Sequence, residues 1–473
     1  SQSIVAGVQG FTFANIQLDA SQSGEDVRIS SVPVYYADVS GTPASSFSGC
    51  QLWDGVTPLN TGGRVINSVT TGTNSTHTLD NSLTIPKGTV KTLAVKCNLG
   101  TGASGSARFG VNGGTYSATG ATSGNSVSGT ANTSYSGTMT IGTGSYAVSV
   151  DSSSPSFMVV AAGSTGVNAG VVKFRASNED VSLTKLGLIL TSGDNGDVLS
   201  VDIYDGATKV GTAYLTSGTY ATSTLTTAVT LPKDTDKTLT LKANLAGIGS
   251  SESGTAGRVV KIDPNSAEGT GLASGTTIQV GATAGVAGFG MYKSFPTLAL
   301  ESGSQALGTT GMADGRLIRF KITADAKGPV GIGSLGFSIS TTSVSVTNVA
   351  LYGYTNSTYS SAISGQGTSG QIGSTIATWT YGAENKIVPT TNAVQVPAGQ
   401  TYYFELRGSV SGATTGSSVV TTLNGDSTAQ AITQAVTATT THSFAWSGNS
   451  TSTSNLTGDA DWTNGYSIEG LPS

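Results

Sequence analysis

One stretch of this chain runs Leu83-Thr-Ile-Pro86-Lys-Gly-Thr-Val-Lys-Thr-Leu93-Ala-Val95-Lys-Cys97-Asn-Leu99. After the proline-led turn, its apolar residues fall at every second position, which is typical of a half-buried β-strand. The same block returns as Thr230-Leu-Pro232-Lys-Asp-Thr-Asp-Lys-Thr-Leu239-Thr-Leu241-Lys-Ala243-Asn-Leu245 and as Val396-Pro397-Ala-Gly-Gln-Thr-Tyr-Tyr-Phe404-Glu-Leu406-Arg-Gly408-Ser-Val410. Three copies, roughly 150 residues apart and so at the usual size of one domain, indicate a β domain repeated three times.

Two further blocks recur in the same order. The first reads Ile16-Gln-Leu18-Asp-Ala20-Ser then Glu25-Asp26-Val27, and returns as Val172-Lys-Phe174-Arg-Ala176-Ser then Glu179-Asp180-Val181, with a weaker copy at Phe320-Lys-Ile322-Thr-Ala324-Asp. The second reads Leu52-Trp53-Asp54-Gly55, Ile203-Tyr204-Asp205-Gly206 and Leu351-Tyr352. Asp-Gly pairs mark turns between strands. Strands at roughly ten-residue intervals predict an all-β protein of three tandem immunoglobulin-like β-sandwich domains.

Proline residues mark the expected boundaries. Pro155 and Pro296 each stand just ahead of a new strand, which suits a stiff junction. We therefore predict domains at 1–154, 155–295 and 296–473, the last with a C-terminal extension. In the first copy the strand that should precede Gly10 is weak, so residues 1–8, chain upstream or another subunit would have to supply it.

Composition excludes several partner classes. Charged residues make up 10% of the chain, against roughly 25% in ordinary globular proteins. The formal net charge is -5 and no basic stripe occurs, so nucleic acid is not an expected partner. No run of 18 apolar residues is present, so no membrane span is expected. The Ser-, Thr- and Gly-rich composition suits a secreted protein.

The two cysteines both lie in the first copy. Cys97 lies two positions after Val95, and Cys50 lies two positions before Leu52. Because side chains alternate between the two faces of a strand, both cysteines should face the core with these apolar residues. We predict a disulfide between Cys50 and Cys97 that crosses from one sheet to the other; the alternative is two free buried thiols. A disulfide would indicate an oxidising, extracytoplasmic location.

Catalysis is not expected. The two histidines, His77 in a polar turn and His442 in a Thr-rich strand, lie in different copies, and no zinc-type spacing occurs. Paired carboxylates can hydrolyse glycosides, but Glu25 and Asp26 recur as Glu179 and Asp180. A recurring pair favours a turn or capping element over an active site.

Calcium is the one cofactor that the sequence suggests, because hard cations prefer carboxylate and carbonyl oxygens on loops. Gly193-Asp194-Asn195-Gly196-Asp197 has that character, as do Asp459 and Asp461, although neither matches a full EF-hand loop. An acidic hairpin turn is the simpler interpretation. If an ion binds, Asp194 and Asp197 are the first-choice ligands.

Other polar and aromatic residues allow weaker expectations. Five sequons permit glycosylation without indicating it, at Asn74, Asn132, Asn356, Asn449 and Asn455. Trp53, Tyr204 and Tyr352 share one repeat position, which favours packing in or near the core over a sugar-binding platform. Trp379, Trp446 and Trp462 have no counterparts in the other copies, so they mark a contact special to the third domain. The closing segment, residues 461–472, is expected to tie the C-terminus to a neighbour.

The Glu-Asp-Val strand, the Tyr-Asp-Gly turn, the Pro-Lys-x-Thr strand and the closing Asp461-Trp462-Thr-Asn464-Gly465-Tyr466 segment together resemble predicted cell-surface repeat proteins of ultra-small episymbiotic bacteria. The module is also similar to surface-layer and adhesin proteins built from tandem immunoglobulin-like domains. The resemblance covers nearly the whole chain. It implies a structural coat or an adhesive role outside the cell, and it carries over no catalytic residues.

Three hypotheses for function follow. The leading one is a self-assembling surface-layer subunit on the cell surface, forming homo-oligomers by lateral or strand-addition contacts, with cell-envelope glycan as a further candidate partner. The alternative is an adhesin or filament subunit that binds a host surface or glycan. A secreted glycan-processing enzyme is the third and least favoured class.

Overall fold

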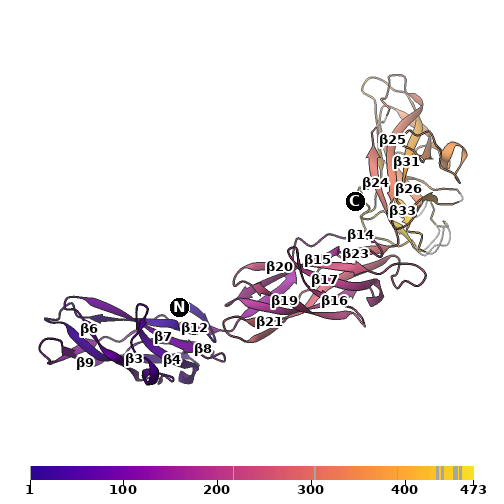
Figure 1. Cartoon of the computed structure of the whole chain (residues 1–473). Coiled ribbons are helices and arrows are strands. Elements are labelled where there is room, and N and C mark those ends of the chain that lie inside the picture. The colour runs from indigo at the N-terminus through magenta and orange to yellow at the C-terminus, as the bar shows by residue number, and fades with distance from the viewer. Residues whose placement is uncertain are drawn as a thin grey trace.

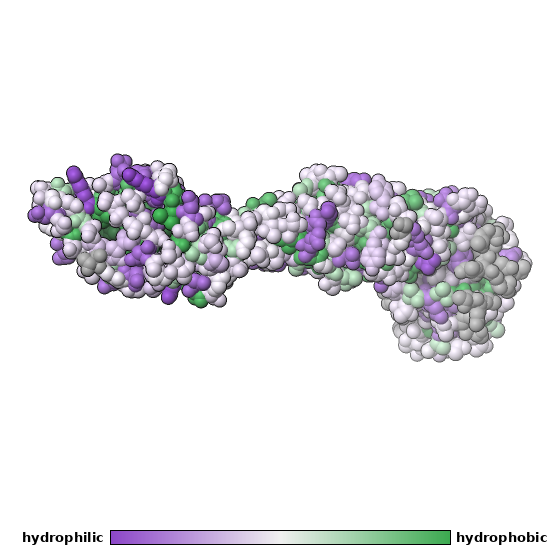
Figure 2. Space-filling view, turned by 90° about the horizontal axis from the view of Figure 1, so that it is seen from below, coloured by the Kyte–Doolittle hydropathy of each residue, from purple (hydrophilic) through white to green (hydrophobic). Residues whose placement is uncertain are grey.

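The computed structural model describes residues 2–216, 218–302, 305–390, 392–432, 436–437, 441–450, 456 and 461–472. These residues form three β-sandwiches that follow one another along an elongated molecule (Figure 1). A narrow waist separates the first sandwich from the second (Figure 2). The prediction of an all-β protein of tandem β-sandwich domains is therefore confirmed.

The first domain has two sheets that enclose one main apolar core, which runs from Ile4 to Ile141. Its elements are β1 (Gln2–Val5), β2 (Phe11–Asp19), β3 (Val27–Ser40), η1 (Ala44–Ser46), β4 (Phe47–Asp54), β5 (Thr57–Pro58), η2 (Gly62–Arg64), β6 (Asn74–Ile85), β7 (Val90–Leu99), β8 (Gly105–Val111), β9 (Gly114–Gly120), β10 (Ser126–Ala131), β11 (Ser134–Tyr135) and β12 (Met139–Gly142). One sheet has the order β2-β7-β4-β5, and the other β1-β12-β8-β3-β9-β10.

The second domain repeats this plan around a core from Tyr146 to Met291. Its elements are β13 (Ser145–Val150), β14 (Met158–Ala161), β15 (Val167–Ser177), β16 (Val181–Ser192), η3 (Asn195–Asp197), β17 (Val198–Asp205), β18 (Thr208–Ala213), β19 (Tyr220–Leu231), β20 (Asp236–Leu245), β21 (Arg258–Gly271), β22 (Thr277–Gly281) and β23 (Phe289–Tyr292). The sheets have the orders β13-β15-β20-β17-β18 and β14-β23-β21-β16-β19.

The third domain has a core from Tyr292 to Ile468. Its elements are β24 (Pro296–Glu301), β25 (Met312–Ala324), β26 (Val330–Thr342), β27 (Ser345–Tyr354), η4 (Thr368–Gly370), β28 (Gln371–Thr378), β29 (Asn385–Ile387), β30 (Val394–Val396), β31 (Thr401–Ser411), β32 (Ser418–Leu423), β33 (Phe444–Ser447) and β34 (Trp462–Asn464). One sheet has the order β24-β25-β31-β27-β28; the other has the order β29-β26-β33-β34, with β30 and β32 also paired to β26.

The strand order of the second domain is that of an immunoglobulin sandwich with additions. The strands A to G of an immunoglobulin sandwich correspond in chain order to β13, β15, β16, β17, β20, β21 and β23. With these letters, one sheet has the order A-B-E-D and the other has the order G-F-C. The added strands β18 and β19 lie at the far edges of the two sheets, and β14 pairs in parallel with β23.

The repeated block forms the central strand of one sheet in each domain. In β7 and β20 its alternate apolar residues are at most 1% exposed, namely Leu93, Val95, Cys97, Leu99, Leu239, Leu241, Ala243 and Leu245. The Asp-Gly turns also form as expected, because Gly55 and Gly206 both adopt a φ of +59°. That left-handed conformation favours glycine.

The change from the first core to the second comes earlier than the predicted boundary at 154. Strand β13 pairs with β15, and its residues Tyr146 and Val148 are buried in the second core. The chain therefore enters the second domain by residue 145, ahead of Pro155. The second core ends at Met291 and the third begins at Tyr292, close to the expected change at 295.

Candidate functional site

One strand position is filled in two domains and open in the first. Strand β13 lies beside β15 in the second domain, and β24 lies beside β25 in the third. The counterpart of these two acceptor strands in the first domain is β2, which has β7 on one side and stands at the edge of its sheet. Residues 2–5 form β1, which pairs in parallel with β12 in the opposite sheet, as β14 pairs with β23 in the second domain. Among the described residues, the outer edge of β2 is therefore unpaired.

A groove of about 830 Å³ runs along this open edge. Strand β2 forms one wall and β9 with β10 forms the other, while residues of β3 line the floor. Its apolar lining includes Leu18, Ile29, Ala118 and Val127, all of which are half-buried.

The open groove divides the core of the first domain. Ala20, Val27 and Ile85 form a separate small cluster there, with exposed fractions of 5%, 7% and 2%. Their counterparts in the second domain, Ala176, Val181 and Leu231, are 0% exposed and belong to its one large core together with Tyr146 and Val148 of β13. Strand β13 thus completes a core that stays divided in the first domain.

The recurring Glu-Asp pair, Glu25 and Asp26 in the first domain, accepts hydrogen bonds from two turns near the groove. The Glu25 carboxylate accepts hydrogen bonds from the Ser123 hydroxyl at 2.6 Å and from the backbone N–H of Thr122 and Ser123 at 2.8 Å each. These bonds, led by the Ser123 hydroxyl, hold the pKa of Glu25 below its usual range. Asp26 accepts a bond from the N–H of Lys87 at 2.9 Å.

Equivalent hydrogen bonds form in the second domain. Glu179 accepts bonds from Ser274 and from the N–H of Ala273, and Asp180 accepts one from the N–H of Lys233. The interpretation of the pair as a turn or capping element is confirmed. Its chemistry is to hold the hairpin tip and the proline turn against the start of one strand.

The recurring aromatic position is half-buried at the margin of the core, as the expectation of packing in or near the core allowed. The Lys96 ammonium lies 4.3 Å from the Trp53 ring centroid, and Lys242 lies 4.5 Å from that of Tyr204. In the third domain the Arg407 guanidinium lies 4.8 Å from the Tyr352 centroid. Since the cations occupy one repeat position as well, the sequence held the signal for this cation–π pair.

The predicted disulfide between Cys50 and Cys97 is present. It does not cross between the sheets, because Cys50 lies on β4 and Cys97 on β7, which are neighbours in one sheet. A bulge between Ser48 and Gln51 shifts the register beside Cys50. The alternation of side chains along each strand correctly predicted that both cysteines face the core, but it could not show which strands are adjacent.

The acidic loop of the second domain is a structural turn. Asp197 is 0% exposed, and its carboxylate accepts bonds from the N–H of Asp194 and of Thr255, each at 2.9 Å. Arg258 adds an ion pair at 3.5 Å. Calcium at Asp194 and Asp197 stays a prediction, and an ion would have to compete with these protein donors.

Over the described part of the chain, no group of three or more His, Cys, Asp or Glu side chains is placed to hold a metal ion. Asp459 lies outside the described residues. Asp461, the other residue of that pair, accepts bonds from the Ser447 hydroxyl at 2.8 Å and from the N–H of Ser450 at 2.9 Å.

Both histidines are buried. His77 lies within β6 instead of in the polar turn expected from its neighbours, and it is 1% exposed. Burial lowers the pKa of His77 to about 4. His442, which precedes β33 and lies outside any strand, has its pKa lowered to about 4, mainly by burial and further by Lys386.

Acid should destabilise the first domain through His77. Its folded pKa of about 4 lies below the usual pKa of about 6.5 for an exposed histidine, so the unfolded state binds the extra proton between these pH values. Lowering the pH from 7 to 4.5 should cost about 2–3 kcal/mol through this group. Urea unfolding followed by Trp53 fluorescence should show this loss in the parent and not in His77→Leu. The third domain, with His442 unchanged, is the internal control; identical pH dependence in parent and variant would contradict the account.

The sequons differ in exposure. Asn74 and Asn132 are exposed. The side chain of Asn356 caps its own loop by accepting bonds from the N–H of Ser360 and Ser361. Asn449 is 6% exposed and donates to Gln395 at 2.7 Å, so the folded chain does not present it for glycosylation. Asn455 lies outside the described residues. Glycosylation itself stays a prediction.

The closing segment binds its own domain. Trp462, in β34, is 1% exposed, and the Trp446 indole N–H donates to the carbonyl of Asn464 at 2.9 Å. Asp426 accepts bonds from the N–H of Ser443 and of Gly465 at 2.7 and 2.8 Å. The segment also reaches the second domain, because the Tyr466 ring lies 5.3 Å from that of Phe157. Its expected role in contacting a neighbouring subunit stays a prediction.

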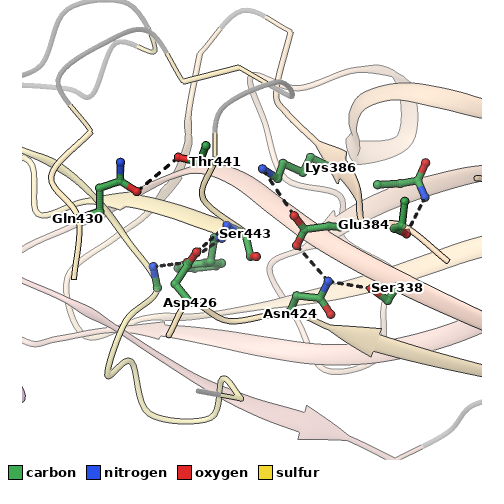
Figure 3. A network of polar contacts seen from close by, with 12 residues as sticks. Ser338, Glu384, Lys386, Asn424, Asp426, Gln430, Thr441 and Ser443 are labelled. Atoms are coloured by element: carbon green, nitrogen blue, oxygen red, sulfur yellow. Dashed lines mark hydrogen bonds and ion pairs between the residues drawn. The ribbon is translucent and has the colours of Figure 1, made fainter. Parts of the chain in front are cut away.

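A second set of polar contacts lies nearby in the third domain. In Figure 3 the amide of Asn424 donates to Glu384 at 3.0 Å and to Ser338 at 2.9 Å, and Lys386 forms an ion pair with Glu384 at 3.5 Å. The same view shows Asp426 bound to Ser443. These contacts bind the loops around 384 and 424 to strand β26.

Trp446 does mark a contact special to the third domain, at its junction with the second. Its ring lies 4.7 Å from that of Tyr292, whose hydroxyl hydrogen-bonds the Thr463 hydroxyl at 3.1 Å. Lys327 donates to the carbonyl of Gly163 across the same junction at 2.6 Å. Trp379 lies elsewhere, buried in the third core.

A buried ion cluster in the third domain was not foreseen from the sequence. Glu405 is 1% exposed and pairs with both Arg319 and Arg407. The Arg319 guanidinium lies 3.7 Å from the Tyr359 ring centroid, and the Tyr354 hydroxyl accepts a bond from Arg407 at 2.9 Å. The cluster depends on the loop after β27, which no repeat pattern revealed.

Comparisons with known proteins leave the family open. No family model matches the chain, and no curated protein matches it. Among the helices of the described ranges, none has the length and apolar character needed to cross a membrane.

Solved structures give only distant likenesses. A protein from Corynebacterium diphtheriae described as membrane-anchored is 10% identical over 89% of this chain and 85% of its own, with a TM-score of 0.20. The C-terminal domain of the Streptococcus agalactiae AgI/II polypeptide BspA is 10% identical over 60% of this chain and 96% of its own, with a TM-score of 0.15. Such TM-scores are too low to carry an argument about fold or function.

Proposed function

We propose that the protein is a structural component of a bacterial cell surface that assembles with copies of itself into an extracellular layer. The observation that carries this proposal is the way the three sandwiches are joined. Side chains and backbone from both domains pack at the second junction, as Tyr292 with Trp446 and Lys327 with Gly163 show. At the first junction, Asn178 of the second domain holds the connecting segment by donating to the carbonyl of Thr143 at 2.8 Å.

Built junctions favour a stiff, extended unit over independent domains on floppy linkers. An extended unit (Figure 1) can span a layer and contact neighbours along its length. The disulfide supports a location outside the cytoplasm, because such bonds persist in oxidising compartments.

Electron microscopy of the purified protein, with and without calcium, tests this function. A two-dimensional lattice is the expected result. Fibres would favour the filament alternative, and dispersed particles in all conditions would contradict assembly. Sedimentation of the same samples provides a second measure of assembly in solution.

A further inference from the structure

The side chains of Lys386, Glu384 and Asn424 lie in contact with one another in the third domain (Figure 3). The Lys386 ammonium lies 3.5 Å from one oxygen of the Glu384 carboxylate, and the other oxygen accepts a hydrogen bond from the Asn424 amide at 3.0 Å. One carboxylate therefore holds an amine and a carboxamide on its two oxygens. An amine can displace ammonia from a carboxamide when a neighbouring acid–base group moves the protons.

The backbone brings these groups together across strand β26. Lys386 of β29 lies opposite Gly336 of β26, and on the other side of β26 the N–H of Asn424 donates to the carbonyl of Gly336 at 2.8 Å. Residues in one such row point to the same face of a sheet. A Cβ at Gly336 would lie 2.1 Å from Oε1 of Glu384. The glycine therefore leaves the space in which the carboxylate lies between the amine and the amide.

Burial distinguishes this cluster from a similar one in the second domain. The side chain of Lys386 is 9% exposed and that of Glu384 is 22% exposed. In the second domain Lys209 lies 2.6 Å from Asp202, which also accepts a bond from Asn244 at 3.2 Å, but the Lys209 side chain is 47% exposed. The hydrogen bond to Asp202 raises the pKa of Lys209, which keeps that amine protonated. Shielding from water favours a neutral amine and acid over the charged forms.

We propose that Lys386 and Asn424 react to form an isopeptide bond within the third domain, with Glu384 transferring the protons. Glu384 takes a proton from the Lys386 ammonium, and the free amine attacks Cγ of Asn424. A bond forms between Nζ and Cγ, the bond from Cγ to Nδ2 breaks, and the released nitrogen leaves as ammonium. The contact between Nδ2 and Glu384 places the leaving nitrogen beside the acid that protonates it. Glu384 ends as a carboxylate, and the reaction uses no oxidant, reductant or co-reactant.

The bond joins β29 to the segment that follows β32, with β26 between them. It gives the third domain a covalent link, as the disulfide between Cys50 and Cys97 does for the first. The inference does not rest on the proposed assembly, because both reacting groups belong to one domain of one chain. Dispersed protein that carries the bond, or a lattice without it, would separate the two.

The mass of the full chain, measured after reduction of the disulfide, tests the proposal. The protein should be lighter than its sequence by about 17 Da, the mass of the ammonia that leaves. Fragmentation of a protease digest should find one branched peptide in which Lys386 is joined to Asn424. An unchanged mass, with the two residues recovered in separate peptides, would overturn the proposal. The peptide that contains Lys209 should be recovered unlinked.

A competing reaction gives the same change in mass. Gly425 follows Asn424, and an Asn-Gly pair can lose ammonia by closing on its own backbone as a succinimide. That product joins no two peptides and does not need Lys386. A mass loss that persisted in Lys386→Arg, with no branched peptide in the parent, would identify the succinimide and contradict the isopeptide bond.

Three variants locate the chemistry. Lys386→Arg keeps a positive charge beside Glu384 but removes the nucleophilic amine, so this variant should show no link. Glu384→Gln keeps the size of the side chain but not its proton transfer, and should slow bond formation by about 100-fold or more, followed as the linked fraction over time. Lys209→Arg, at the exposed cluster, should link at the parent's rate. A link that forms at the parent's rate in Glu384→Gln would refute the role of that residue. Since the mass of the parent decides whether the bond exists, poor folding of a variant does not affect that result.

Discussion

Replacing Glu405 with alanine should lower the free energy of unfolding of the third domain by about 3–5 kcal/mol. The carboxylate is 1% exposed and is the shared partner of Arg319 and Arg407, whose side chains are 18% and 28% exposed. Removing it leaves two half-buried guanidinium groups facing each other without the charge between them. Denaturant unfolding, followed by the fluorescence of the tryptophans in this domain, measures the loss.

Glu301→Ala is the matched control for this prediction. Glu301 lies on the same sheet and pairs with Lys321 at 2.7 Å, but both side chains are partly exposed. Its loss should cost under about 1 kcal/mol, as for other surface pairs. If Glu405→Ala cost no more than Glu301→Ala, the cluster would not stabilise the domain.

Removing the disulfide should destabilise the first domain by about 4 kcal/mol. The bond joins residues 47 positions apart, and closing a loop of that length reduces the entropy of the unfolded chain by roughly this amount. The variant Cys50→Val/Cys97→Ala copies Val201 and Ala243, which face each other in the second domain. It therefore removes the cross-link while keeping a packing that this fold already uses.

Denaturant titration with Trp53 as the probe checks this effect, since Trp53 is the tryptophan of the first domain. The denaturant concentration at which half of the third domain is unfolded should not change. Equal stability of the variant and the oxidised parent would show that the cross-link adds nothing beyond packing.

Local periodicity predicted much of the fold. The alternation in residues 83–99 predicted a buried strand, and the order of the blocks predicted tandem sandwiches. Parity placed Cys50 and Cys97 on the core side. Each of these features depends on residues close in sequence, where side-chain direction follows the pleat.

Features that depend on strand neighbours could not be predicted in this way. The disulfide joins adjacent strands because β4 lies beside β7, and β13 joins the second domain because it pairs with β15. The Glu405 cluster needs strands β25 and β31 and the loop that contains Tyr359. The groove appears where a strand that the second and third domains contain has no counterpart among the described residues of the first domain.

The central claim is that this chain is a structural subunit that assembles with copies of itself at a cell surface. High-resolution electron microscopy of the assembled protein tests it most directly. The account predicts a two-dimensional lattice of ordered, extended subunits. Protein that stays dispersed in every condition would contradict it.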